Sequence, residues 1–190
     1  MPVQNQLLCF PKEDAQKRLL LGKPGSQNLL CIGINPHTAH GKKLDPTSKN
    51  VAKIAQNHGY DGWFLMNLYP KRTAKVALLE TRADLLLFQE NLSYIQTFLE
   101  HNDFKIRTIW LAWGNGIAST EHPYLREAAE QLYLISTRLS FNFVSIGINH
   151  SGHPTHPSPQ ALAQKFRKDY TKIRLIPFDF NRYILDIVRT

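Results

Sequence analysis

Four short apolar runs, each ending near a proline, glycine or asparagine, limit what this 190-residue chain can fold into. The runs cover residues 29–34, 63–68, 106–113 and 141–148. Their length and their bounding residues predict buried strands. The segments between them are long enough to be helical crossovers between parallel strands. We therefore predict an α/β fold, a three-layer sandwich with a central four-stranded parallel sheet and helices on both faces.

The helical segments are predicted from apolar spacing and from capping residues. Asp45-Pro46 has the sequence of an N-cap followed by proline at the first helical position, and it begins a helix that ends near His58. Four further helices are predicted over residues 85–99, 121–137, 159–170 and 178–188.

Length and composition predict one domain that covers residues 1–190. The hydrophobic fraction of 43% is sufficient for a sizeable core, and no internal repeat or linker interrupts the chain. Two cysteines are too few for a disulfide framework or an iron–sulfur cluster. No apolar run approaches the ~20 residues that cross a bilayer. We expect a cytoplasmic protein with no membrane partner.

The charge of the chain favours an anionic partner. Lys and Arg number 23 against 15 Asp and Glu, which gives a net charge of +8. Such a balance is typical of proteins that bind nucleic acid or nucleotides. The alternative is a soluble protein that is basic without binding any polyanion. Four basic residues near the predicted strand ends are candidates for phosphate contacts: Lys42, Lys43, Lys71 and Arg72.

Polar side chains follow each of the four predicted strands. Asn35 follows the first, Asn67 ends the second, and Asn115 follows the third. Because the carboxyl ends of parallel strands meet at one edge of a sheet, we expect these side chains to line one pocket. An asparagine amide offers both a donor and an acceptor, which suits a nucleobase edge or a bound water. A single loop asparagine can also simply cap its own turn.

The fourth strand leads into Ser151–Pro159, in which two His-Pro steps and three prolines exclude a helix. His153 and His156 therefore lie on a stiff loop at the same predicted edge. Near neutral pH they could donate to a developing anion or act as acid and base, or they could be solvent-exposed and idle.

Histidines also recur every third residue, at 150, 153 and 156 and at 37 and 40, so metal binding is an alternative. Asp45 or Asp61 could complete such a site. The loop has no cysteine and no HExxH pairing, and its prolines spread the side chains apart. We therefore expect no metal and no other cofactor.

The strand ends, taken in order, resemble the motifs of the uracil-DNA glycosylase superfamily. Gly33–Pro36 is similar to the first motif of its mismatch-specific branch, and Met66-Asn67 to its base-reading asparagine. Trp113–Asn115 is similar to the turn after its third strand, and His156–Pro159 to its second catalytic motif. More closely, the chain resembles a bacterial and phage family, domain of unknown function 1643. That likeness extends from about residue 29 to residue 159, in the motifs around Asn35, Asn67 and His156 and in two further motifs, Asp45–Thr47 and Trp113-Gly114.

The glycosylase resemblance implies a DNA-binding hydrolase of repair or modification. Asn35 would position a water for attack at C1′, His156 would stabilise the leaving base, and Asn67 would read its edge. His37, His153 and Asn115 are the further substrate-binding candidates. A base in a duplex would have to be flipped out.

The chain departs from that superfamily in three respects. Asn35 replaces the aspartate of the stronger uracil enzymes, and His37 replaces their methyl-excluding tyrosine. Gln160-Ala161 replaces the Leu-Ser of the intercalating loop. The sequence therefore leaves open a non-catalytic binding module on the same fold and, as a third alternative, a metal-dependent hydrolase.

Overall fold

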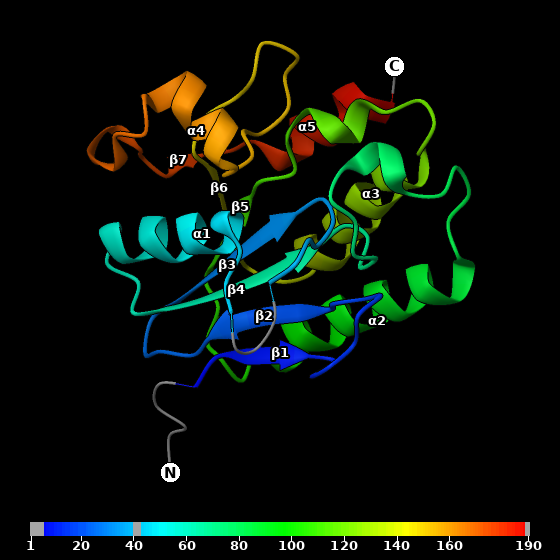
Figure 1. The fold of residues 1–190 in the computed structure, drawn as a ribbon, viewed down its shortest axis with the longest axis horizontal. Coiled ribbons are helices and arrows are strands. Elements are labelled where there is room, and N and C mark those ends of the chain that lie inside the picture. The colour runs from blue at the N-terminus through cyan, green and yellow to red at the C-terminus, as the bar shows by residue number, and fades with distance from the viewer. Residues whose placement is uncertain (1–5, 40–42, 189–190) are drawn as a thin grey trace.

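The computed structural model describes residues 6–39 and 43–188. In these residues seven strands form one sheet in the order β1-β2-β4-β3-β5-β6-β7, which Figure 1 shows from β1 at the bottom to β7 at the top. The four central strands are parallel, and the outer ones are antiparallel. The strands are β1 (Leu8–Phe10), β2 (Leu20–Lys23), β3 (Asn28–Gly33), β4 (Gly62–Asn67), β5 (Thr108–Leu111), β6 (Asn142–Ser145) and β7 (Ile176–Pro177).

The four predicted strands correspond to β3, β4, β5 and β6, and their parallel pairing is confirmed. The predicted strand number is wrong, because three short antiparallel strands extend the sheet. These strands have two to four residues each, too few to show a clear alternation. β7 contains Pro177, which an edge strand tolerates because one side of it needs no ladder hydrogen bonds.

All five predicted helices are present, with small shifts at their ends. The third begins three residues later than predicted, and the fourth ends four residues earlier, at Phe166. The helices are α1 (Pro46–Asn57), α2 (Leu85–His101), α3 (Tyr124–Thr137), α4 (Pro159–Phe166) and α5 (Phe180–Val188). Three short 3₁₀ turns accompany them: η1 (Val76–Leu78), η2 (Gly114–Ala118) and η3 (Tyr170–Lys172).

Helices cover both faces of the sheet, so the three-layer arrangement is confirmed (Figure 1). Alternation along the strands directs Leu30 and Ile32 of β3 to one face and Leu29 and Cys31 to the other. On the first face α2, α3 and α5 pack against the sheet, and on the second face α1 and α4 do so.

The register of the central strands aligns their carboxyl ends. Gly33, the last residue of β3, pairs with Asn67, the last residue of β4. Helix α1 begins near this edge. Asp45 caps this helix as predicted, and its side chain accepts a 2.8 Å hydrogen bond from the Ser48 N–H. The loops after β3 and β4 therefore leave the sheet side by side.

Among the described residues, no helix is both long and apolar enough to cross a membrane.

Candidate functional site

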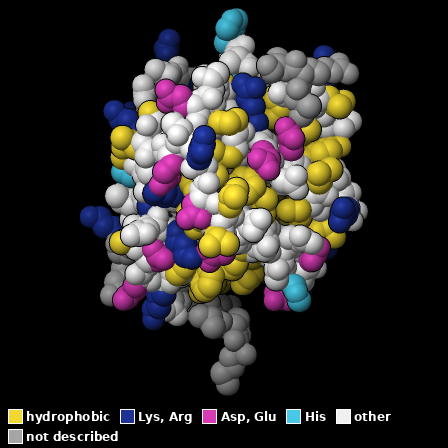
Figure 2. Space-filling view, turned by 90° about the vertical axis from the view of Figure 1, so that its right-hand side faces the viewer, with side chains coloured by type: hydrophobic (Ala, Val, Ile, Leu, Met, Phe, Trp, Pro, Cys, Tyr) yellow, Lys and Arg dark blue, Asp and Glu magenta, His cyan; other side chains and the backbone are white. Residues whose placement is uncertain are grey.

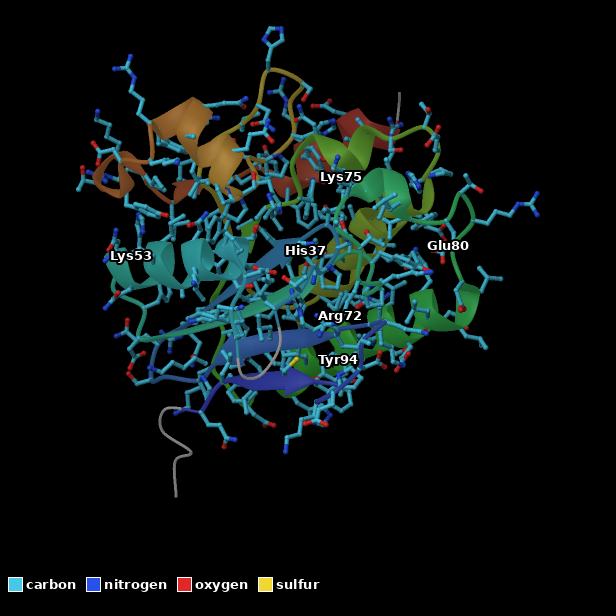
Figure 3. All side chains as sticks on the ribbon, in the orientation of Figure 1. His37, Lys53, Arg72, Lys75, Glu80 and Tyr94 are labelled. Carbon is cyan, nitrogen blue, oxygen red and sulfur yellow. The ribbon has the colours of Figure 1, made fainter. Side chains whose placement is uncertain are left out.

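A cavity of about 480 Å³ lies at the carboxyl ends of the parallel strands. Its size is within the usual range for small-molecule sites. Five of the predicted site residues line it: Asn35, His37, Asn67, Asn115 and His156. Figure 3 shows His37 and Lys75 from this wall close to where β3 and β4 end. The prediction that the strand exits share one cavity is confirmed for these five residues.

Asn67 contributes a buried amide with unused hydrogen-bonding capacity. The residue is 2% exposed, and its Nδ2 has no hydrogen-bond partner among the described residues. Its backbone is held in place by Asn91 of α2, whose side chain donates to the Asn67 oxygen at 2.9 Å. A buried N–H without a partner costs about 1–3 kcal/mol, so an acceptor group on a ligand in this cavity would be favoured at this position.

Gly33 keeps the space that the Asn67 side chain needs. A Cβ at position 33 would lie 2.8 Å from Asn67 Oδ1, closer than carbon and oxygen normally approach. The glycine of the Gly-Ile-Asn-Pro motif is thus explained by the amide across the β3–β4 pair.

Asn35 is held in one orientation by the loop after β4. Its Nδ2 donates to the backbone oxygen of Thr73 at 3.0 Å, to Thr73 Oγ1 at 2.9 Å and to the Pro36 oxygen at 3.2 Å. With Nδ2 committed in this way, Oδ1 is the part of the amide that remains for a ligand. An oriented acceptor of this kind can hold a water by accepting its proton in a hydrogen bond.

His156 is a neutral hydrogen-bond donor at the cavity wall. Its Nδ1 accepts from the Ser158 N–H at 3.1 Å, which assigns the ring proton to Nε2. Burial lowers the pKa of His156 to about 4, although the charge of Asp45 acts in the opposite direction. At neutral pH the ring is therefore uncharged, and its Nε2–H can donate to a ligand.

Gly114 allows the histidine loop to approach the end of β5. Its φ is +69°, and a Cβ there would lie 2.9 Å from His156 Cβ. Its N–H also donates to the Pro154 oxygen at 2.9 Å. The Trp-Gly step after β5 thus sets the position of His156.

His153 does not line the cavity, and its side chain is occupied elsewhere. Its Nδ1 lies 2.9 Å from the hydroxyl of Tyr183 in α5, and this hydroxyl also accepts from Trp113 Nε1 at 2.9 Å. The residue is buried, and its ring lies edge-on to Tyr183. These contacts give His153 a role in fixing the loop, and its predicted substrate contact stays a prediction.

A family model described as a protein of unknown function (DUF1643) matches residues 18–158, which is most of the chain. The chain belongs to the DUF1643 family. No curated protein and no solved structure matches it. The likeness of this DUF1643 protein to uracil-DNA glycosylases therefore rests on the four strand-end motifs alone.

The basic residues predicted to contact phosphates differ in exposure and in hydrogen-bond or ion-pair partners in the DUF1643 protein. Lys71 forms an ion pair with Glu80, and Lys43 is exposed. Arg72 donates to four backbone oxygens, those of Asp14, Lys17, His37 and Ala39. Lys42 lies outside the described residues. On the face in Figure 2, basic side chains are interspersed with acidic and hydrophobic ones, so this face carries no continuous basic patch.

A larger cavity of about 990 Å³ adjoins the first and shares His37, Thr73 and Ala74 with it. Two of the four charged side chains that line it in the described structure, those of Asp14 and Arg72, are used within the protein. Arg72 binds the backbone oxygens described above, and Asp14 Oδ1 accepts from the N–H groups of residues 16 and 17. We place the candidate site in the smaller cavity, where Asn67 Nδ2 and Arg18 Nε have no hydrogen-bond partner among the described residues.

Sequence reasoning missed three residues that form or support the site. Arg18 precedes β2 and lines the cavity, Thr73 orients Asn35, and Asn91 holds the backbone of Asn67. Only Asn91 had a signal, as a polar residue on the buried face of a predicted helix. Across the described ranges, no group of three or more His, Cys, Asp or Glu is arranged to hold a metal ion.

The depressed pKa of His156 predicts a loss of stability in acid. Because the unfolded chain binds the proton with a pKa near 6.5 and the folded chain near 4, stability is complete above about pH 6.5 and falls between these values. For a partly exposed ring the loss is on the order of 2 kcal/mol. Urea unfolding at pH 7 and pH 4 should show a smaller loss for His156→Gln than for the wild type. An equal loss in both would contradict a half-buried ring that stays neutral in the folded protein, and His150→Gln, on the exposed part of the loop, serves as the control.

Proposed function

We propose that this DUF1643 protein binds a nucleobase, carried by a nucleotide or a nucleic acid, and hydrolyses its N-glycosidic bond. The observation that carries the proposal is a pair of donors in one cavity for which the described residues supply no acceptor, the buried amide of Asn67 and the Nε2–H of neutral His156. A nucleobase presents acceptors and donors along one flat edge, which is the complement of such a wall.

The proposed reaction divides the chemistry among three side chains. Asn67 binds the edge of the base, and Asn35 Oδ1 positions a water at C1′. As the bond from C1′ to the base nitrogen breaks, its electron pair stays on the base, and His156 Nε2–H donates to the oxygen on which negative charge develops. The water forms the new bond to C1′ and releases its proton to solvent. Donors aimed at a developing anion in a partly dry site lower the barrier electrostatically.

A second candidate function, binding without hydrolysis, is supported by the absence of a free carboxylate among the described residues of the cavity wall. Asp45 is the carboxylate among the described residues of the cavity wall. Its Oδ1 accepts from the N–H and Oγ of Ser48, and its Oδ2 accepts from the Ala39 N–H at 3.2 Å. A carboxylate engaged in this way is poorly placed to take a proton from water, so Asn35 would have to act by positioning alone.

One panel experiment tests both candidates. Single-stranded and duplex oligonucleotides and nucleotides carrying uracil, hypoxanthine, alkylated and hypermodified bases are assayed in parallel for binding and for released base. Binding with release supports hydrolysis, and binding without release of any base supports the second candidate. Absence of both from the whole panel contradicts the proposal.

Asn67→Ala is expected to weaken binding of the preferred ligand by about 10- to 100-fold, the value of a lost bidentate base contact. Asn57→Ala, an exposed change at the end of α1, is the matched control and should leave affinity unchanged. Calorimetric titration of both variants measures the difference. Equal affinity of Asn67→Ala and the wild type would exclude Asn67 as the base-reading residue.

A further inference from the structure

Arg18 brings a buried positive charge to the wall of the candidate site. It is 1% exposed and lines the cavity together with Asn67, Asp45 and His156. Burial lowers the pKa of Arg18 to about 10, which still leaves the guanidinium charged at neutral pH. A buried charge is costly unless other groups pair with it.

The hydrogen bonds of Arg18 within the described structure do not supply that pairing. Its Nη1 donates to the Ala39 oxygen at 3.2 Å, whereas its Nε has no partner among the described residues. Arg72 offers a direct comparison, because its Nε and Nη1 together reach four backbone oxygens. Among the described residues, Arg72 therefore has the backbone partners expected of a structural arginine, and Arg18 has only one.

Asp45 is the natural candidate for a partner, but its oxygens are directed to other groups. They accept from Ser48 and from the Ala39 N–H, and none of the ion pairs found in the described part of the chain joins Asp45 to Arg18. Burial would raise the pKa of Asp45, but the Ser48 hydrogen bonds and the charge of Arg18 lower it below its usual value. Asp45 thus stays ionised and offsets part of the charge without using the guanidinium N–H groups.

Two further cationic residues, one close to Arg18 and one elsewhere on the cavity wall, add to the positive charge. Arg72 lies near enough to act on Arg18 electrostatically, and Lys75 lines the same cavity. Helix α1 also begins here, with Thr47 of its first turn on the wall, although the Asp45 carboxylate already accepts from the N–H of Ser48 in that turn. The cavity therefore has two recognition surfaces, neutral donors at Asn67 and His156 and a cationic one at Arg18.

We propose that Arg18 pairs with an anionic group, a carboxylate or a phosphate, carried by the ligand whose base Asn67 and His156 recognise. This inference rests on the proposed function and narrows its substrate class to acidic bases or to nucleotides whose phosphate reaches into the cavity. Because Asp45 offsets part of the positive charge, the expected advantage of the anion is about tenfold in affinity rather than larger.

The test compares neutral and anionic ligands in matched pairs by calorimetric titration of the full chain. Uracil is paired with 5-carboxyuracil, and each common nucleoside with its 5′-monophosphate. The first pair places the charge on the base and the second places it on the sugar, so the two sources of the anion are distinguished. At least one anionic ligand should bind about tenfold more tightly than its neutral partner.

Variants of Arg18 assign the preference to this residue. In Arg18→Met the tenfold advantage should fall below about twofold, and Arg18→Lys should retain part of it. Lys53→Met, on the outer side of α1 and far from His37 in Figure 3, removes the same charge away from the site and should keep the full advantage. Thermal unfolding confirms that each variant is folded, and Met is a suitable replacement because apolar substitutes for buried charges are often tolerated.

The outcomes separate this inference from the proposed function. Equal affinity of the wild type for every neutral and anionic pair overturns the role of Arg18, while Asn67-dependent binding of those ligands leaves base recognition standing. A preference that persists in Arg18→Met also overturns it. If no member of the panel binds, both proposals fail.

Discussion

Replacing His156 by alanine is expected to lower the rate of base release by about 100-fold or more while changing ligand affinity only a few-fold. The donor contributes mainly when negative charge develops on the leaving base, so its loss raises the barrier more than it weakens the ground state. Steady-state and single-turnover measurements on the preferred substrate give the rate and the affinity separately. A rate within threefold of the wild type would exclude His156 from catalysis.

Two further variants refine this expectation. His156→Gln keeps an N–H donor on a side chain of similar reach, so it should recover part of the lost rate. His150→Ala removes an exposed imidazole from the same loop and should leave the rate unchanged. Since the pKa of His156 is about 4, the wild-type rate should show no titration of this group between pH 6 and 8 and should fall only as the pH approaches 4.

Gly114→Ala is expected to destabilise the protein by about 3 kcal/mol and to displace the histidine loop. About 1–2 kcal/mol comes from placing alanine at positive φ, and the rest from the contact of the new Cβ with His156 Cβ. For a chain of this length the loss corresponds to a fall in Tm of several degrees. Thermal unfolding measures it, and the ¹H–¹⁵N resonances of the loop report the displacement.

Gly59→Ala is the matched control for this change. Gly59 also has a positive φ, +83°, but nothing lies within 4 Å of a Cβ built there. Its replacement should cost only the backbone contribution, about 1 kcal/mol, and should leave the histidine loop in place. Equal destabilisation by the two substitutions would show that Gly114 matters for its backbone conformation and not for the approach of His156.

The central sheet could be predicted from the sequence because its strands are fully buried. Burial on both faces makes β3 and β4 continuous apolar runs, and prolines and glycines mark where such runs end. The order of strands and helices then determines which strand ends share an edge of the sheet. Asn35, Asn67 and His156 could therefore be placed together from the sequence alone. The short edge strands have no such signal, since two to four residues can pair without a distinctive pattern.

The orientation and the hydrogen-bond partners of each site residue could not be predicted, because they depend on residues that are distant in the sequence. Thr73 fixes the amide of Asn35 from the loop after the neighbouring strand. His153 and His156 are three residues apart and look equivalent in sequence. In the structure His153 is hydrogen-bonded to the Tyr183 hydroxyl, whereas His156 lines the cavity. Arg18 precedes a strand that was not predicted, so nothing in the sequence connected it with the strand ends.

The hydroxyl of Tyr183 also shows that the folded unit extends past the region that defines the family. The family match ends at residue 158, but helix α5 lies beyond it and provides the group that joins Trp113 to His153. A shortened protein ending at residue 158 would leave the indole N–H and the imidazole nitrogen without their shared partner and would uncover the sheet face that α5 protects. Helix α5 therefore supports the loop that forms the candidate site. A protein expressed for study should include this helix.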